Sequence, residues 1–296
     1  MRVMQRILRS LLIFVLLAVA GFSADTPRVA EWRKKAEAGD AKSQELMGEC
    51  YADDASSDGI PSDYAEAIKW YRLAAEQGSA DAQSNLGLMY ANGTGVPWDD
   101  AEAVKWYRRA AEQGNANAQT NLGYIYHKGV GVPQDNAEAV QWWRKGAEQG
   151  NANAQSNLGV MYDNGVGVPQ DYAKAVKWYR LAAEQGNANA QFNLGVMYDN
   201  GKDVWKNYAK AVKWYRLAAE QGNAGAQFNL GVMYANGTGV PEDLVQAHVW
   251  WNIAGAKGRG DSKKMLAMIE PEMTSEQKAE AMKLARVLFA KLPKEQ

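Results

Sequence analysis

Apolar residues recur along the chain with the spacing of helix faces. Gln83, Leu86 and Tyr90 lie at i, i+3 and i+7, which is the spacing of one face of an α-helix. Ser79 precedes this stretch and belongs to the residue types that cap helix N-termini. A glycine-rich run follows it, as expected for a tight turn. The pattern therefore predicts a short amphipathic helix over 80–90.

A second helix is predicted after the turn. Ala103, Trp106 and Ala110 form an apolar stripe with helical spacing. Asp99 stands three residues before Glu102, which is the spacing of a capping box at a helix N-terminus. A glycine then closes the pattern as a C-terminal cap. The sequence thus predicts two helices joined by a turn.

This helix pair recurs every 36 residues. One position of every copy is a tryptophan, which we expect in the core: Trp70, Trp106, Trp142, Trp178, Trp214 and Trp250. Self-similarity at a fixed period of this size indicates a solenoid of stacked helix pairs. The expected fold is therefore all-α, with six repeats at 41–78, 79–114, 115–150, 151–186, 187–222 and 223–258. The first repeat has extra residues in the polar stretch 53–57.

A glycine interrupts the first helix of five successive copies, at Gly87, Gly123, Gly159, Gly195 and Gly231. Glycine inside a helix costs about 1 kcal/mol relative to alanine. Its recurrence within one chain indicates a steric need. We expect a Trp or Tyr of a neighbouring helix to cross against the bare backbone.

The two ends of the repeat array differ from its middle. Residues 24–40 are predicted to form an N-terminal capping helix, with Trp32 and Ala36 covering the first repeat. Residues 259–296 are predicted to form C-terminal capping helices, one over 262–269 and one over 274–290. Terminal caps of this kind are expected because the end repeats of a solenoid have no neighbour on one side.

The N-terminal segment 1–23 has the build of a secretory signal peptide. Three arginines precede the apolar run Leu11–Ala20, and small residues surround a cleavage site after Ser23. The run is short for a bilayer-spanning helix. A retained N-terminal anchor is the alternative. We expect a periplasmic or secreted protein, from a bacterial host, with no membrane-spanning segment after cleavage.

Charge and cysteine content narrow the function classes. The formal net charge of −1 gives no basic footprint for a nucleic-acid partner. The single cysteine, Cys50, excludes an internal disulfide framework. It stands at an apolar position of the repeat, so we expect a buried, inert thiol.

The repeat resembles Sel1-like repeats, relatives of the tetratricopeptide repeats, through the run A-x-A-Q-x-N-L-G-x-x-Y-x-x-G-x-G-V-P-x-D-x-x-x-A-x-x-W-Y-x-x-A-A-E-Q-G. The resemblance implies a right-handed superhelix of antiparallel helix pairs. It also implies adaptor or scaffold roles in bacterial envelopes or eukaryotic secretory compartments. Some relatives carry a disulfide in each repeat and have reported penicillin-binding or β-lactamase activity. Those cysteines are missing in this chain.

No set of side chains suggests catalysis, a metal or a cofactor. His127 and His248 lie several repeats apart, and neither has cysteines or paired acids at metal-ligand spacing. We expect His127 to be exposed and His248 to lie at the boundary of the core. Trp98 and Trp205 break the repeat pattern within turns, where they either contact a partner or pack locally.

By the resemblance, the first helices line a concave groove that binds a protein or peptide client. The inward positions that vary between repeats are Ser84, Leu88, Thr120, Tyr124, Ser156, Val160, Asp163, Phe192, Val196, Asp199, Phe228 and Val232. The groove is therefore expected to be apolar in its C-terminal half, with two acids at its rim. The alternative for the two phenylalanines is packing between helices.

We thus expect an exported, non-catalytic adaptor or scaffold that binds a protein through its concave groove. One alternative is a hydrolase of β-lactams or cell-wall fragments, as in the cysteine-rich relatives. A second alternative is a structural component of the cell envelope.

Overall fold

The computed structural model describes residues 26–53 and 60–293, and these form helices without any strand. The helices are α2 (Pro27–Glu37), α3 (Ala41–Ala52), α4 (Tyr64–Glu76), α5 (Ala80–Asn92), α6 (Asp100–Glu112), α7 (Ala116–Lys128), α8 (Asn136–Glu148), α9 (Ala152–Asn164), α10 (Tyr172–Glu184), α11 (Ala188–Asn200), α12 (Tyr208–Glu220), α13 (Ala224–Ala235), α14 (Leu244–Ala256), α15 (Ser262–Ile269) and α16 (Ser275–Lys291), with a 3-10 helix at Glu270–Glu272. The expected all-α fold is confirmed. The predicted signal peptide lies outside the described residues.

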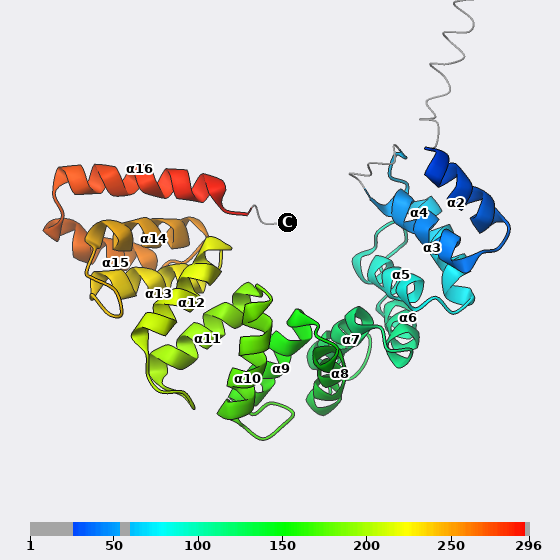
Figure 1. Cartoon of the computed structure of the whole chain (residues 1–296), viewed down its shortest axis with the longest axis horizontal. Coiled ribbons are helices and arrows are strands. Elements are labelled where there is room, and N and C mark those ends of the chain that lie inside the picture. Colours follow the sequence, from blue (N-terminus) through cyan, green and yellow to red (C-terminus); the bar gives the residue numbers. More distant parts are fainter. Residues whose placement is uncertain (1–25, 54–59, 294–296) are drawn as a thin grey trace, which may run out of the picture. The chain divides into compact units, whose positions relative to one another are not determined.

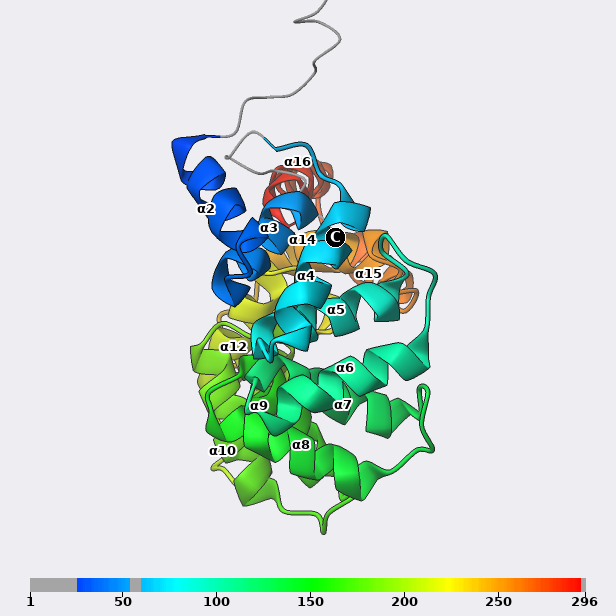
Figure 2. The ribbon, with the colours of Figure 1, turned by 90° about the vertical axis from the view of Figure 1, so that its right-hand side faces the viewer.

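The chain divides into two compact segments, 1–118 and 119–296. Within each, a first helix packs against the second helix of its own repeat, and that second helix packs against the first helix of the next repeat (Figures 1 and 2). In the first segment α3 pairs with α4 and α5 with α6. In the second segment α9 pairs with α10, α11 with α12 and α13 with α14. These consecutive helix hairpins form the predicted solenoid.

Side-chain caps set the helix boundaries. The Asp99 carboxylate accepts a hydrogen bond from the backbone N–H of Glu102 at 3.0 Å, which caps α6. The Glu102 side chain pairs with Lys105 instead of returning to the cap, so the predicted capping box forms only in part. Helix α5 runs two residues beyond the predicted end and closes at Gly93, whose φ is 66°.

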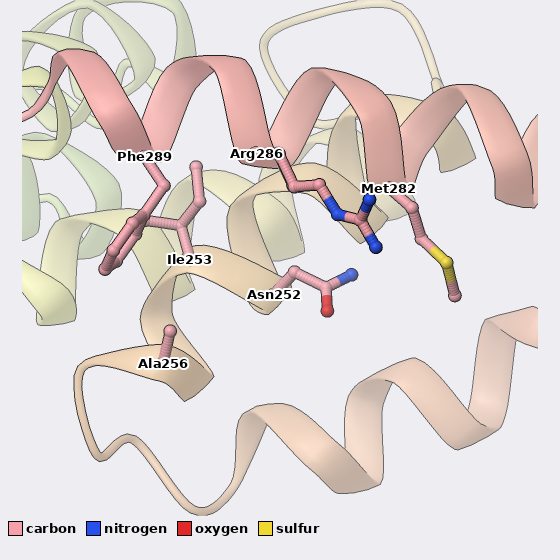
Figure 3. A pocket seen from close by; sticks show the side chains of 7 residues that line it. Asn252, Ile253, Ala256, Met282, Arg286 and Phe289 are labelled. Carbon is pink, nitrogen blue, oxygen red and sulfur yellow. The ribbon is translucent and has the colours of Figure 1, made fainter.

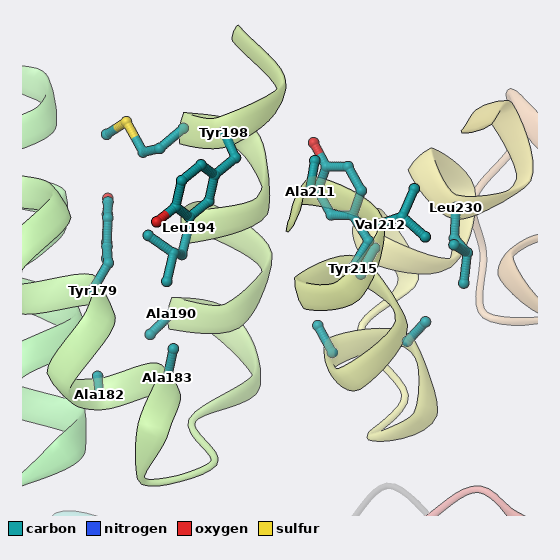
Figure 4. Packing of buried hydrophobic residues seen from close by; sticks show 14 of the residues in the cluster. Tyr179, Ala182, Ala183, Ala190, Leu194, Tyr198, Ala211, Val212, Tyr215 and Leu230 are labelled. Carbon is teal, nitrogen blue, oxygen red and sulfur yellow. The ribbon is translucent and has the colours of Figure 1, made fainter. Parts of the chain in front are cut away.

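The recurring mid-helix glycines lie against aromatic rings, as predicted. A Cβ at Gly159 would lie 2.6 Å from the ring of Tyr179 in the second helix of the same repeat. Figure 4 shows Tyr179 and Tyr215 between the helices of the second segment. The same relation joins Gly87 to Tyr107. The aromatic residue involved directly follows the repeated tryptophan.

Buried amides connect successive repeats. The Gln155 side chain donates to the Ala147 carbonyl oxygen at 3.1 Å and accepts from Gln185 at 2.8 Å. Gln191 makes the corresponding bonds to Ala183 and Gln221, at 3.1 and 2.7 Å. Because these side chains are buried, each bond satisfies a group that would otherwise be costly to bury. The recurring glutamine thus fixes the register between hairpins.

Helices outside the repeats cover both ends of the array. Helix α2 packs on α3, with Ala36 buried and Trp32 half-buried, as predicted. At the other end α15 and α16 pack on α14. Thr274 and Gln277 form a complete capping box at the start of α16. Among the helices the structure describes, none is long and apolar enough to cross a membrane.

Candidate protein-binding surface

The first helices of the second segment present a row of accessible side chains. We call this row the first-helix surface, and its members are Tyr124, Val160, Asp163, Val196, Asp199 and Val232. Tyr124 is 52% exposed, and the valines and aspartates are half-buried. In the first segment, Leu88 occupies the corresponding position of α5 and is also exposed.

Three predicted groove residues are not accessible. Ser84, Thr120 and Ser156 are buried, so their placement on the groove was wrong. They lie on the side of the first helix that faces other helices. In α7 the Trp143 indole of the paired helix donates to the backbone carbonyl oxygen of Thr120 at 3.0 Å. Small side chains leave room for this approach.

Phe192 and Phe228 occupy the same helix position and are half-buried. The Phe192 ring centroid lies 6.0 Å from that of Tyr215, and a Cβ at Gly225 of the next first helix would lie 3.1 Å from the Phe192 ring. The Phe228 ring centroid lies 6.4 Å from that of Trp251. Both phenylalanines therefore pack between helices, as the alternative interpretation expected, with part of each ring accessible.

Buried tyrosines orient the two acids of the first-helix surface. The Tyr215 hydroxyl donates to Asp199 Oδ2 at 3.3 Å. Burial, reinforced by the nearby Asp199 carboxylate, raises the pKa of Tyr215 above its usual range. Burial and Asp163 act in the same way on the pKa of Tyr179. Both phenols therefore stay protonated and able to donate to the carboxylates.

Some first helices of successive repeats touch directly. Within the second segment α9 contacts α11, and within the first segment α3 contacts α5.

Neither histidine is where the sequence placed it. His127 is half-buried, with Nδ1 2.7 Å from Asn136 Oδ1 and its ring centroid 5.6 Å from that of Trp143. His248 is 1% exposed, not at a boundary, because Glu270 and the terminal helices cover its end of α14. Burial lowers the pKa of His248, although Glu270, 3.4 Å from Nε2, acts in the opposite direction.

In the stretches 26–53 and 60–293, no three His, Cys, Asp or Glu side chains are placed to hold a metal ion. Cys50 is buried, as expected, and forms no disulfide.

A pocket of about 310 Å³ lies between α14 and α16 (Figure 3). Its walls are largely apolar, from residues such as Ile253, Ala256 and Phe289, with Asn252 and Arg286 as polar groups. The repeat pattern could not predict it, because one wall belongs to α16, outside the repeats. The one indication of this pocket in the sequence is that α16 carries apolar residues on more than one face.

The two irregular turn tryptophans are both exposed. Trp98 is 68% exposed, and its indole donates to Asp100 Oδ1 at 2.9 Å. Trp205 is 95% exposed. Asp203 in the same turn has a φ of 51°, where other repeats have glycine.

The architecture defines an α-helical solenoid of helix hairpins. More specifically, the chain belongs to the Sel1 repeat family: six copies of the repeat match, at 41–79, 80–115, 116–151, 152–187, 188–223 and 224–258.

Two solved structures are similar over most of this chain. One is a protective antigen of uropathogenic Escherichia coli, with 39% identity and a TM-score of 0.76 over 88% of this chain. This chain covers 56% of that protein's length. The other is a Sel1 repeat protein of Oxalobacter formigenes, with 34% identity and a TM-score of 0.70, covering 82% of this chain and 96% of that one. No curated protein sequence gives a match.

Proposed function

We propose that this protein is an exported adaptor that binds a client protein through its first-helix surface, without catalysing a reaction. Sel1 repeats typically act as scaffolds for protein interaction. The observation that carries the proposal is the row formed by exposed Tyr124 and by Val160, Val196 and Val232, which pack against the core but keep part of their surface accessible. Apolar contacts flanked by oriented carboxylates suit an interface with an apolar centre and a polar rim.

Stacked, rigid helices lose little conformational entropy when they bind a partner. The buried amide bonds of Gln155 and Gln191 hold successive hairpins in register. A client therefore meets side chains that are already positioned, which reduces the entropy lost on binding. The Asp199 carboxylate favours a client with a basic residue beside its apolar contacts, whereas Asp163 already lies 3.5 Å from Lys202.

Export is the second part of the proposal. Its support is the sequence of residues 1–23, with an arginine-rich start, an apolar run and small residues at the end. The similar Escherichia coli protein is a protective antigen, which is consistent with a protein accessible from outside the cell. Fractionation of a bacterial host should place the protein in the periplasm or medium.

The hydrolase alternative requires a nucleophile and a base within reach of each other. Among the described residues His248 is enclosed by Asn252 and Glu270, and Cys50 is buried in another segment. We therefore expect purified protein to leave nitrocefin unhydrolysed. Sustained turnover would establish the hydrolase instead.

Site-specific photo-crosslinking tests the binding surface. A photoreactive residue at Val160 or Val196 should capture one defined partner in the native host. Leu181 and Leu217 provide matched controls, because they are exposed apolar residues on the second helices of the same two repeats. The proposal predicts capture from the valine positions only.

Equal capture from both sets of positions would remove the case for the first-helix surface. Capture of many abundant envelope proteins, without one defined partner, would favour the alternative of a structural envelope component.

A further inference from the structure

The turn between α11 and α12 differs from the other turns of the chain. In four other repeats the turn follows the pattern Gly-x-Gly-Val-Pro-x-Asp, as in 165–171 and 237–243. The turn 201–207 instead reads Gly-Lys-Asp-Val-Trp-Lys-Asn. The four common turns can therefore be compared directly with the turn 201–207 in the same chain.

The backbone of the turn keeps the common shape. Gly201 has a φ of 71° and Gly165 one of 66°. Asp203 has a φ of 51°, where Gly167 has 70°. A non-glycine residue in this left-handed region costs about 1–2 kcal/mol. The chain therefore keeps the turn at a cost in stability, while Trp205 stays 95% exposed.

Packing inside the molecule does not explain Trp205. Trp98, the other irregular turn tryptophan, is held by its hydrogen bond to Asp100. Across residues 26–53 and 60–293, Trp205 makes no hydrogen bond or ring contact. An unsupported, almost fully exposed indole is typical of a contact residue, since tryptophan is enriched at energetically important interface positions.

Lysines border Trp205 on both sides. The Lys202 ammonium lies 4.9 Å from the ring centroid of Tyr172, at the start of α10. The Lys206 ammonium lies 5.0 Å from the ring centroid of Tyr208, at the start of α12. The turn therefore reaches the N-terminal ends of both helices, and Trp205 lies between the two lysines in sequence.

Helices α10 and α12 are also more basic than their counterparts. Each carries three cations and one carboxylate, whereas α4 and α8 carry two of each. The difference arises at the third helical residue, which is Lys174 or Lys210 here. The corresponding residues in the preceding repeats are Glu66, Glu102 and Glu138. The excess of positive charge thus lies on α10 and α12, the two helices whose N-terminal ends the turn reaches.

Part of this positive charge has no carboxylate within ion-pair distance among the described residues. Lys174 pairs with Asp171 at 2.9 Å, and Lys202 lies 3.5 Å from Asp163. Lys206 and Lys210 have no carboxylate at ion-pair distance among the described residues, and their ammonium groups lie over tyrosine rings. We call the following residues the Trp205 surface: Lys174, Lys202, Trp205, Lys206 and Lys210.

We propose that the Trp205 surface binds an acidic segment of a partner protein, with an apolar side chain of that segment placed against the indole. Carboxylates at Asp163, Asp171 and Asp203 lie among the lysines. A flat anionic membrane would meet those carboxylates and the lysines together, whereas a peptide can place its acids at the lysines alone. The first-helix surface shares no residue with the Trp205 surface, although its Asp163 lies 3.5 Å from Lys202. This inference does not depend on the proposed function.

The test compares the natural chain with a variant that carries the common turn. The substitutions are Lys202→Val, Asp203→Gly, Trp205→Pro, Lys206→Gln and Asn207→Asp, which reproduce residues 166–171. Its melting temperature should equal or exceed that of the natural chain, because the strained Asp203 is removed. A loss of binding would then not arise from unfolding.

The probe is a phage-displayed library of random twelve-residue peptides, selected on the natural full-length chain. We expect enrichment of peptides that combine Asp or Glu with Trp, Phe or Leu. A labelled peptide from this pool should bind the turn variant at least tenfold more weakly, and likewise Lys174→Glu/Lys210→Glu. Binding should weaken as salt rises from about 50 to about 300 mM. Trp98→Gln is the matched control and should bind as the natural chain does.

Three outcomes would overturn the inference. The first is a selection without acidic enrichment, and the second is equal binding to the turn variant. The third is association of the natural chain, but not the variant, with phosphatidylglycerol vesicles in the absence of any acidic-peptide preference. That result would show that the Trp205 surface binds an anionic membrane.

Discussion

At the residue scale, a few side chains determine how closely the helices pack. The recurring mid-helix glycine is a poor helix former, yet it allows an aromatic ring to lie on the backbone. The low helix propensity of this glycine is thus offset by the close helix packing that it permits. The adjacent alanines of the second helices are buried in the same core.

Gly159→Ala should therefore destabilise the protein although alanine favours helix. The new Cβ would lie 2.6 Å from the Tyr179 ring, which forces the two helices apart. We expect a loss of about 2 kcal/mol in the free energy of unfolding, measured by urea denaturation.

Gly255→Ala is the control for this substitution. Gly255 stands where other repeats have alanine, and its added Cβ would meet Ser262 at an ordinary 3.5 Å. It should be neutral or stabilising by up to about 1 kcal/mol. A stabilising Gly159→Ala would refute the steric role of the ring.

At the element scale, the terminal helices give α14 an environment that no other second helix has. His248 occupies a position that is valine in four other repeats. Its Nδ1 accepts from the Asn252 amide at 2.7 Å, while Nε2 faces Glu270 from the short 3-10 helix. A titratable group is thereby buried in the last repeat.

Protonation of His248 should lower stability in mild acid. Burial lowers the pKa of His248 in the folded state. Below about pH 6.5 the unfolded state therefore binds a proton at His248 that the folded state does not bind. This stabilising contribution is complete above the unfolded pKa and is lost as pH falls. Urea denaturation at about pH 7.5 and about pH 5.5 should show a smaller pH effect in His248→Val.

At neutral pH, His248→Val should change stability by less than about 1 kcal/mol, since the Asn252 amide keeps its bond to the residue-248 carbonyl oxygen. An unchanged pH dependence in the variant would show that another group is responsible.

At the scale of the whole molecule, the repeat makes hairpins interchangeable. Helices α9 and α11 differ only at Ser156 and Phe192, and α10 and α12 have identical sequences. Each hairpin contacts mainly its neighbours, so stability is approximately a sum of repeat and interface terms.

Deletion of residues 151–186 should therefore leave a folded protein. It joins Gly150 to Asn187, which reproduces the native Gly-Asn junction, and α11 would then pack on α8 in place of α9. Helical circular dichroism should persist, with a smaller urea m-value because less surface is buried. Deletion of 151–168 removes a single helix and should abolish cooperative unfolding. Equal behaviour of the two deletions would contradict nearest-neighbour stacking.

The fold could be predicted well from the sequence because every repeat has the same spacing of apolar, capping and turn residues. Periodicity alone located the helices, the caps and the glycine–aromatic contact. It did not determine the rotation of each first helix about its axis, which buries Ser84, Thr120 and Ser156. Nor did it predict the burial of His248 or the pocket beside Arg286, because both depend on helices outside the period.

The most direct test of client binding is calorimetric titration of the crosslinked partner against two paired variants. Val160→Asp/Val196→Asp changes the first-helix surface, and Leu181→Asp/Leu217→Asp changes the second helices of the same repeats. We predict at least about tenfold weaker binding for the valine pair and unchanged affinity for the leucine pair, measured at a temperature where circular dichroism shows both variants to be folded, because the valines also pack against the core. Weaker binding in the leucine pair alone would place the client on the opposite face and contradict the proposed function.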